Sequence, residues 1–349
     1  MGPAAVLPRF KGDVNNSGRG DATLLFNWQN NAAIFTDVDL VGGQRILQDT
    51  WHGLSAYPMA GIKGVAGDFD GDDFTDAAFF RTAGSGRVTL QLLRSTLDPN
   101  KINTYHAPAQ VWDSLGGGTW LLDKMRPLAG DFNADDREDI AVFYETGGCV
   151  TALLVFFSTG TGFAPPAQLW SSGWCQANAY YVAGDFNGDG RRDLASYYHY
   201  GGGHTAIWNW MSTPTGFRTG IKSLDLTGYD VTTAKIVSGD FNGDGRTDVA
   251  HLTPGVNQEW RVFGLYSAGE TFSAPAEWYR HPQWSADPAR IVVNAADYNA
   301  DGKADLGFYY RYPNQQIGWW YGQGTATGIA PFTPLEIYGP IVATLVSAI

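Results

Sequence analysis

Six acidic, glycine-rich loops recur along the 349-residue chain, and their residue types are those that bind hard cations. The heptapeptide GDFNGDG occurs word for word at 184–190 and again at 239–245. Its wider pattern is Asp-x-Asn/Asp-x-Asp-Gly-x-x-Asp, and the six copies begin at Asp13, Asp68, Asp131, Asp185, Asp240 and Asp297. Calcium takes six to eight oxygen ligands. Side-chain oxygens at positions 1, 3, 5 and 9, with the carbonyl of position 7, would supply most of such a shell.

We therefore predict five or six structural calcium ions, one in each loop. Loop 2 has four carboxylates and should bind most strongly, whereas loop 1 has only two and is the weakest. The predicted ligands are Asp13, Asn15, Ser17, Arg19 and Asp21 in loop 1; Asp68, Asp70, Asp72, Phe74 and Asp76 in loop 2; Asp131, Asn133, Asp135, Arg137 and Asp139 in loop 3; Asp185, Asn187, Asp189, Arg191 and Asp193 in loop 4; Asp240, Asn242, Asp244, Arg246 and Asp248 in loop 5; and Asp297, Asn299, Asp301, Lys303 and Asp305 in loop 6.

Position 6 of the loop requires a sharp turn, which glycine makes at little cost. Asp73 and Asp136 stand there in loops 2 and 3, and aspartate tolerates the left-handed conformation better than most residues. The alternative interpretation is an Asx-type turn with solvated carboxylates and no metal. Six loops in phase, which hold about half of the 35 acidic residues, favour the metal.

The segments around the loops predict the elements that position them. Each unit of about 55 residues has four short apolar runs separated by turns, and this pattern is typical of a four-stranded antiparallel blade. We predict an all-β, six-bladed β-propeller in which residues 1–349 form a single domain, with repeats starting near residues 12, 67, 130, 184, 239 and 296. A seven-bladed ring is the alternative, and a solenoid or a sandwich fits less well. The C-terminal run 341–349 could close the ring by pairing near residues 6–10.

Composition limits the classes of binding partner and the cellular compartment that we expect for the protein. The net charge of −12 and the pI of about 4.8 argue against nucleic acid, which requires a basic face. No run approaches the ~20 apolar residues of a membrane-spanning helix. The start of the chain shows no signal peptide. Cys149 and Cys175 fall on the same predicted face, so they could form a disulfide or remain unpaired. A disulfide and reliance on calcium would both suit a secreted protein.

The loops resemble FG-GAP/VCBS-type repeats, the calcium-bearing blades of integrin α-subunit propellers and of many secreted microbial proteins. This resemblance covers essentially the whole chain. A weaker resemblance is to fungal propeller lectins of the Psathyrella velutina type. It rests on Gly117–Trp120, on Lys124–Ala129 and on Gly162–Gln168. Those lectins have seven blades, whereas this chain has six units.

Aromatic residues in the predicted connections between blades suggest a function. They are Trp51, Trp120, Trp174, Tyr229 and Trp284. Exposed Trp and Tyr rings can stack on sugar rings, although any one of these residues could instead wedge two blades together. We expect a secreted, calcium-stabilised, lectin-like protein whose partners are glycans or glycoproteins, and a binding protein rather than an enzyme. The alternatives are a protein-binding adhesion or scaffold propeller and a polysaccharide lyase or hydrolase.

Overall fold

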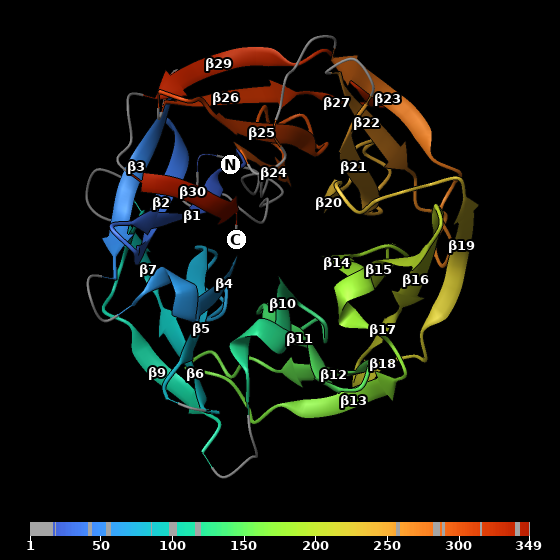
Figure 1. The fold of residues 1–349 in the computed structure, drawn as a ribbon. Coiled ribbons are helices and arrows are strands. Elements are labelled where there is room, and N and C mark those ends of the chain that lie inside the picture. The colour runs from blue at the N-terminus through green and yellow to red at the C-terminus, as the bar shows by residue number, and fades with distance from the viewer. Residues whose placement is uncertain are drawn as a thin grey trace, which may run out of the picture.

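Six four-stranded antiparallel sheets stand around a central axis, as a computed structural model of the protein shows (Figure 1). The structure describes residues 17, 19–40, 44–53, 57–84, 86–97, 103–115, 120–255, 259–281, 287, 290–314, 316–338 and 343–348. We number the sheets as blades 1 to 6, in the order in which the chain reaches their second strands. The prediction of an all-β, six-bladed propeller is confirmed, and the seven-bladed alternative is wrong.

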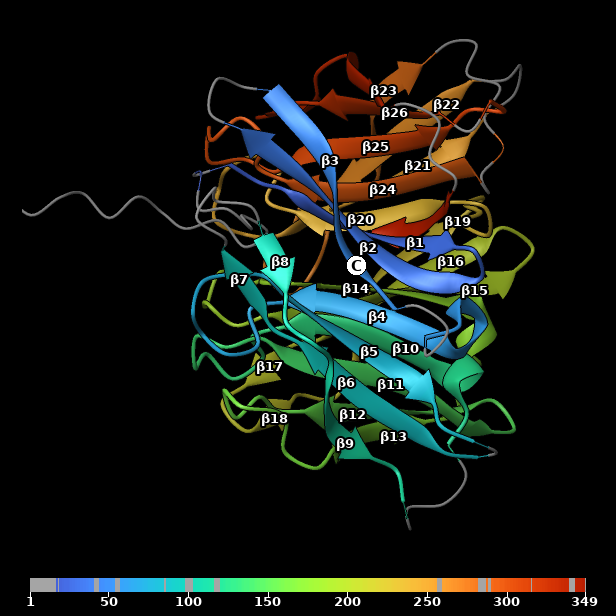
Figure 2. The ribbon, with the colours of Figure 1, turned by 90° about the vertical axis from the view of Figure 1, so that its left-hand side faces the viewer.

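Each blade has one strand beside the axis and three strands farther out (Figures 1 and 2). From blade 1 to blade 6, the innermost strands are β30 (Ala343–Ala348), β4 (Ile62–Gly67), β10 (Met125–Gly130), β14 (Ala179–Gly184), β20 (Lys235–Gly239) and β24 (Ile291–Ala296). The second strands are β1 (Ala22–Trp28), β5 (Asp76–Thr82), β11 (Asp139–Gly147), β15 (Asp193–Gly201), β21 (Asp248–Pro254) and β25 (Asp305–Arg311).

The outer half of each blade varies more in length. The third strands are β2 (Asn31–Leu40), β6 (Val88–Leu93), β12 (Val150–Phe156), β16 (His204–Trp210), β22 (Trp260–Leu265) and β26 (Ile317–Gly322). The outermost strands are β3 (Gln44–His52), β9 (Ala109–Asp113), β13 (Ala167–Ser172), β19 (Ile221–Thr227), β23 (Ala276–His281) and β29 (Thr333–Tyr338).

Short hairpins and 3₁₀ turns complete the described elements. The hairpins, which follow third strands, are β7 (Ser95–Leu97) with β8 (Asn103–Tyr105), β17 (Ser212–Thr213) with β18 (Gly216–Phe217), and β27 (Gly324–Thr325) with β28 (Gly328–Ile329). The 3₁₀ turns, which precede innermost strands, are η2 (Met59–Gly61), η3 (Leu122–Lys124) and η4 (Gln176–Asn178). In the part of the chain that the structure describes, no helix is long and apolar enough to cross a membrane.

The ring is closed by the C-terminal strand, which supplies the innermost position of the first blade. β30 pairs antiparallel with β1, in the register Trp28 with Ala343 and Leu24 with Ala348. The C-terminal segment that we expected to close the ring does so as β30, and its described partner is β1. The expected pairing with residues 6–10 lies outside the described residues. The first and last parts of the chain thus share one sheet, so the circle is fastened by backbone hydrogen bonds.

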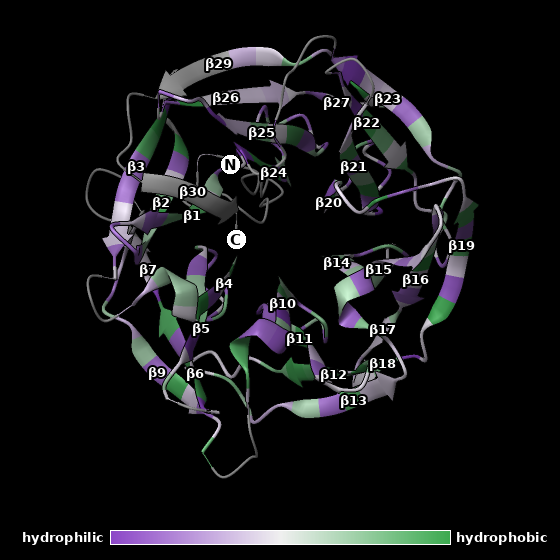
Figure 3. Cartoon of the chain, viewed as in Figure 1, coloured by the Kyte–Doolittle hydropathy of each residue, from purple (hydrophilic) through white to green (hydrophobic). Residues whose placement is uncertain are grey.

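The hydrophobic core lies between the blades. The buried apolar residues group into six clusters, and each cluster joins two neighbouring blades. The aromatic residue at loop position 2 contributes to this packing. The ring centroids of Phe69 and of Phe163 in the next blade are 5.3 Å apart, and those of Phe186 and Phe272 are 5.2 Å apart. Outermost strands such as β9 and β19 face solvent on one side, and they alternate between hydrophobic and hydrophilic residues (Figure 3).

Candidate functional site

Loops 2 to 6 connect the innermost strand of a blade to its second strand, so they lie together on one face of the ring, which we call the loop face. Their backbone wraps around the first aspartate. In loop 4 the side chain of Asp185 accepts the N–H groups of Gly188, Asp189 and Gly190 at 2.7, 3.1 and 2.8 Å. Loop 5 repeats these contacts with the same residue types around Asp240. The carboxylate at position 1 therefore organises the turn.

Two positions in each of loops 2 to 6 have a positive φ. Position 6 does so as predicted, including Asp73 with φ 71° and Asp136 with φ 65°. Position 4 is also left-handed, and it is alanine in two loops, Ala134 and Ala300, both with φ 61°. The sequence analysis missed this second requirement, although the glycines at position 4 of loops 2, 4 and 5 signal it.

The aspartate at position 9 opens the second strand and is buried in loops 2 to 6. In loop 2, Asp76 Oδ1 accepts the Ser95 N–H at 2.7 Å and Oδ2 accepts the Phe69 N–H at 3.2 Å. Burial is the largest cause of a raised pKa in all five closing aspartates. The pKa reaches about 8 for Asp76, about 6 for Asp193 and about 7 for Asp139, Asp248 and Asp305. Each closing carboxylate is thus costly to ionise without a cation.

Loop 2 brings its carboxylates closest together. Oxygens of Asp68, Asp70 and Asp76 all lie within 4.8 Å of one another. Asp70 Oδ1 is buried and has no hydrogen-bond partner, and its second oxygen lies 3.4 Å from Arg94 Nε. A buried carboxylate oxygen without a donor costs free energy, and a cation at this point would satisfy it. The donor set therefore fits calcium, which binds carboxylate oxygens.

Loops 3 to 6 differ from loop 2 because asparagine stands at position 3 and a basic residue at position 7. In loop 4, Asn187 Nδ2 donates to Asp189 Oδ2 at 3.1 Å, and the Arg191 guanidinium pairs with the same carboxylate. Loops 3 and 5 repeat both contacts, and in loop 6 Lys303 takes the place of the arginine. The position 5 carboxylate is thus already partly neutralised in these four loops.

Neighbouring loops are joined by a repeated backbone hydrogen bond. The N–H at position 8 of one loop donates to the carbonyl oxygen at position 1 of the loop in the preceding blade. The described bonds are Glu138 to Asp68, Arg192 to Asp131, Thr247 to Asp185, Ala304 to Asp240 and Gly20 to Asp297, at 2.6–2.8 Å. Five described hydrogen bonds therefore link successive loops around the axis. A shift in the backbone of one loop would displace the hydrogen-bond partner in the next loop.

Loop 1 carries a protein cation beside its closing aspartate. Arg45 Nη2 lies 3.7 Å from Asp21 Oδ1, and Nη1 donates to the Gly20 carbonyl at 3.1 Å. The guanidinium also pairs with Asp37 at 3.3 Å, and both Asp21 and Asp37 are buried. Ser17 and Arg19 are described, whereas Asp13 and Asn15 lie outside the described residues. The closing aspartate of loop 1 thus already has a cationic side chain beside it, which the closing aspartates of loops 2 to 6 do not have among the described residues.

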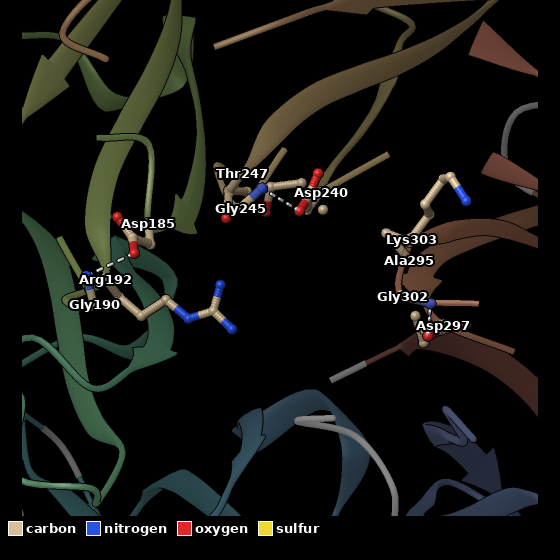
Figure 4. Close-up of a pocket in the computed structure, with 14 residues that line it drawn as sticks. Asp185, Gly190, Arg192, Asp240, Gly245, Thr247, Ala295, Asp297, Gly302 and Lys303 are labelled. Carbon is tan, nitrogen blue, oxygen red and sulfur yellow. Dashed lines mark hydrogen bonds between the residues drawn. The ribbon is translucent and has the colours of Figure 1, made fainter. Parts of the chain in front are cut away.

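Loops 4, 5 and 6 and the ends of β20 and β24 line a cavity of about 420 Å³ on the loop face (Figure 4). The dashed lines in Figure 4 mark the position 6 N–H donating to the first aspartate in loops 4, 5 and 6. The side chain of Arg192 extends into the opening between the blades (Figure 4). This end of the axis is therefore surrounded by the acidic loops.

The four predicted sugar-stacking aromatics that the structure describes lie on the opposite face, which we call the turn face, but they mainly pack between blades. Trp51 stacks on Phe79 with ring centroids 5.6 Å apart, and Trp120 lies 5.1 Å from Trp112. The Tyr229 hydroxyl lies 2.5 Å from His251 Nε2. Trp51, Trp120 and Tyr229 are half-buried, and Trp284 lies outside the described residues.

Trp174 requires a correction. It is only 6% exposed and packs against Trp170, Tyr198 and Trp208. Because several aromatic rings surround it, its faces are not open to a sugar. It acts as a wedge between blades 3 and 4, which is the alternative that the sequence left open for each of these residues.

The exposed aromatic that the sequence analysis missed is Tyr200, at the end of β15. Its side chain is 47% exposed, and its ring stacks on His204 with centroids 4.7 Å apart. Trp208 Nε1 donates to the Tyr200 hydroxyl at 3.2 Å. Asp225 lies beside this pair, 2.5 Å from His204 Nε2 and 2.5 Å from Lys222 Nζ. An open ring thus adjoins a cluster of polar groups, which we call the Tyr200 cluster.

The two cysteines are joined on the turn face. Cys149 lies in the hairpin between β11 and β12, Cys175 precedes η4, and the structure pairs them in a disulfide with a Cα–Cα distance of 4.1 Å. The bond links the second turn of blade 3 to the connection that leaves the same blade. It therefore fastens the segment that leads from Trp174 into the next blade.

The chain is similar to one known repeat family and to several solved structures. Residues 185–251 match the FG-GAP-like repeat family. No curated protein sequence matches the chain. A solved structure of an Agrocybe aegerita lectin that recognises non-reducing terminal N-acetylglucosamine is 16% identical, with a TM-score of 0.57 over 92% of this chain and 91% of that chain. AofleA from Arthrobotrys oligospora is 11% identical, with a TM-score of 0.53 over 97% and 92%. The stretch 185–251 thus matches an FG-GAP-like repeat, and the chain shares its fold with these two structures.

Proposed function

We propose that the protein is a secreted, calcium-stabilised propeller that binds glycans through its turn face. The observation that carries the glycan assignment is the Tyr200 cluster, where an exposed aromatic ring adjoins hydrogen-bonding side chains. Tyr and Trp combine an apolar ring with a polar group, and this combination suits a sugar, which presents C–H faces and hydroxyls. The fold shared with a lectin that recognises N-acetylglucosamine supports the same assignment.

Calcium is proposed as a structural ion in loops 2 to 6. The closing aspartates are buried, and Asp70 Oδ1 and Asp248 Oδ2 are buried without a hydrogen-bond partner. A divalent cation would neutralise these groups and stabilise the turn between the first two strands of each blade. In loop 1 the guanidinium of Arg45 lies beside Asp21 instead. We therefore propose five ions rather than six.

Secretion is proposed from the disulfide and from the calcium requirement. Disulfides persist mainly in oxidising compartments. Weak calcium sites are filled where the ion is abundant, as it is outside cells. Both features agree with glycans or glycoproteins on a surface as the partners.

Glycan binding is tested by screening the calcium-loaded protein on a glycan array and titrating the best ligand into the protein by calorimetry. Tyr200→Phe keeps the ring and loses only the hydroxyl, so it serves as the matched control for Tyr200→Ala. We expect Tyr200→Ala to weaken binding about tenfold or more, because the stacking surface is lost, and Tyr200→Phe to weaken it less. Melting temperatures of both variants show whether they fold.

The outcomes separate the candidate functions. Competition by a free monosaccharide supports the lectin assignment. Binding to a protein ligand that no sugar displaces would identify an adhesion or scaffold protein. Time-dependent cleavage of a polysaccharide would identify an enzyme. Equal affinities for Tyr200→Ala and the unmodified protein would show that the Tyr200 cluster is not the glycan site.

A further inference from the structure

Three basic residues stand at one level of the central axis, near the turn face. Lys63, Arg126 and Lys235 each lie four residues before the glycine that pairs with the closing aspartate of their blade. Tyr180 has the same register in blade 4. All four residues line one cavity of about 740 Å³. The innermost strands of blades 2 to 5 thus contribute three cations and one phenol to the same space.

Two of these cations converge on the same acceptors. Lys63 Nζ donates to the Met125 carbonyl at 2.6 Å and to the Asp123 carbonyl at 3.3 Å. Arg126 Nη1 donates to the same two oxygens, at 2.9 and 2.7 Å. Because both groups are positive, this placement brings like charges together in a partly buried space.

The local acidic groups do not offset this charge. Among the described residues, none of the three cations forms an ion pair with a carboxylate. The carboxyl of Asp123 raises the pKa of Lys63, and that of Asp287 raises the pKa of Lys235. In both lysines burial lowers the pKa by more than the carboxyl raises it. Burial and then Arg126 lower the pKa of Lys63 to about 8. Lys63 therefore keeps most of its charge at neutral pH, at an energetic cost.

A purely structural role explains only part of this arrangement. Lys63 and Arg126 bond to carbonyls at the end of η3, and so they help to fix that turn. Lys235 has no such bond among the described residues, yet it lies at the same level and lines the same cavity. In a chain of net charge −12, three cations that line one cavity are a local concentration of positive charge.

We propose that this cavity, the channel mouth on the turn face, is a binding site for a small oxyanion, such as the carboxylate or sulfate group of an acidic saccharide. An oxyanion at this point would accept charge-assisted hydrogen bonds from the guanidinium and the ammonium groups. It would also relieve the repulsion between Lys63 and Arg126. This site lies on the axis and is separate from the Tyr200 cluster, so it goes beyond the proposed glycan site.

The test is calorimetric titration of the full chain, loaded with stoichiometric calcium, at fixed ionic strength. The probes are sodium sulfate, sodium glucuronate and neutral glucose. We expect one sulfate or one glucuronate to bind per chain and glucose not to bind at this site. The double variant Lys63→Gln, Lys235→Gln should lose at least about tenfold in affinity, since two charged contacts are removed. Arg218→Gln, directly after β18, is the control, because Arg218 is an exposed cation outside this cavity and outside the Tyr200 cluster, and it should bind as the unmodified protein does.

Two further measurements complete the test. Without anion, Lys63→Gln should melt at the same temperature as the unmodified protein or higher, because a buried like charge is removed. Tyr200→Ala should leave sulfate binding unchanged, so failure of the glycan assignment and failure of this one can be told apart. Binding of sulfate without glucuronate would support the site and assign it to a tetrahedral anion. No binding of either anion up to about 10 mM, or equal affinity in the double variant, would overturn the proposal.

Discussion

The backbone N–H of Glu138 donates to the carbonyl oxygen of Asp68 at 2.7 Å, and this single bond joins the acidic loops of blades 2 and 3. The side chain of Glu138 also fills the space beside Gly67, where an added Cβ would lie 1.9 Å from a Glu138 oxygen. The glycine before the first aspartate in loops 2 to 5 is therefore required by the neighbouring blade, whereas in loop 6 Ala296 stands at that position and the residue opposite it is Gly20. The glycine gives the next loop room to approach.

A double-mutant cycle at the interface of blades 5 and 6 tests this close approach. A Cβ at Gly239 would lie 2.6 Å from the Ala304 Cβ, and the backbone at Gly239 does not otherwise exclude alanine. We expect Gly239→Ala to lower the free energy of unfolding by about 1–3 kcal/mol through overpacking. Ala304→Gly should recover at least half of that loss in the double variant, as measured by denaturant unfolding. Additive effects of the two changes would contradict a direct contact.

The left-handed positions of the loops allow a reciprocal test. Asp136 has φ 65° and Gly190, its counterpart in loop 4, has φ 86°. We expect Asp136→Gly to raise the free energy of unfolding by about 0.5–1 kcal/mol, because the backbone strain of a non-glycine residue is removed. Gly190→Asp should lower it by a similar amount. Thermal melts in saturating calcium check both, and a change of the same sign in the two variants would refute this account of position 6.

The closing aspartates predict how stability depends on pH. Their folded pKa values, about 6 to 8, lie above the ordinary value of 3.8, so the calcium-free folded chain binds more protons than the unfolded chain between these limits. Stability should therefore fall as the pH rises from about 4 to about 8 when calcium is chelated. Calcium binds the ionised form of the closing aspartates, so saturating calcium should remove this loss of stability.

The comparison must allow for His251, whose pKa burial lowers to about 3 and which acts in the opposite direction. Its effect is present with and without calcium, so the difference between the two melting curves isolates the aspartates. We expect that difference to grow from pH 5 to pH 8. A difference that is constant across this range would show that the closing carboxylates do not bind the ion.

The disulfide predicts a redox dependence. Cys149 and Cys175 are 26 residues apart, and closing a loop of this length restricts the unfolded chain. We expect the Cys149→Ser, Cys175→Ser double variant to lose about 2–4 kcal/mol of unfolding free energy. A reducing agent should lower the melting temperature of the unmodified protein and leave the double variant unaffected. Equal sensitivity of both proteins to the reductant would mean that the bond does not form.

The sequence predicted the parts of the fold that repeat. The six loops, the second and third strands and the left-handed position 6 all recur with fixed spacing, so their signals reinforce one another. Position 4 was missed because Ala134 and Ala300 interrupt its glycines. The pairing of β30 with β1 was not predicted, because the two strands lie more than 300 residues apart and no local pattern encodes their register.

The features that occur once could not be predicted from spacing. Arg45 reaches Asp21 from β3, and only the folded blade brings the two together. Tyr200 was missed because exposure depends on what packs above a ring, which a strand pattern does not reveal. The basic residues of the channel mouth had a usable signal, since Lys63, Arg126 and Lys235 stand at the same distance before a repeated glycine.

The most direct test of the account is the number of calcium ions that the folded chain retains, measured by native mass spectrometry and paired with melting curves in calcium and in chelator. We predict five bound ions and a lower melting temperature after chelation, since an ion at 100 times its dissociation constant stabilises the folded state by roughly 2.7 kcal/mol. A chain that retains no calcium and melts at the same temperature in both conditions would contradict the account.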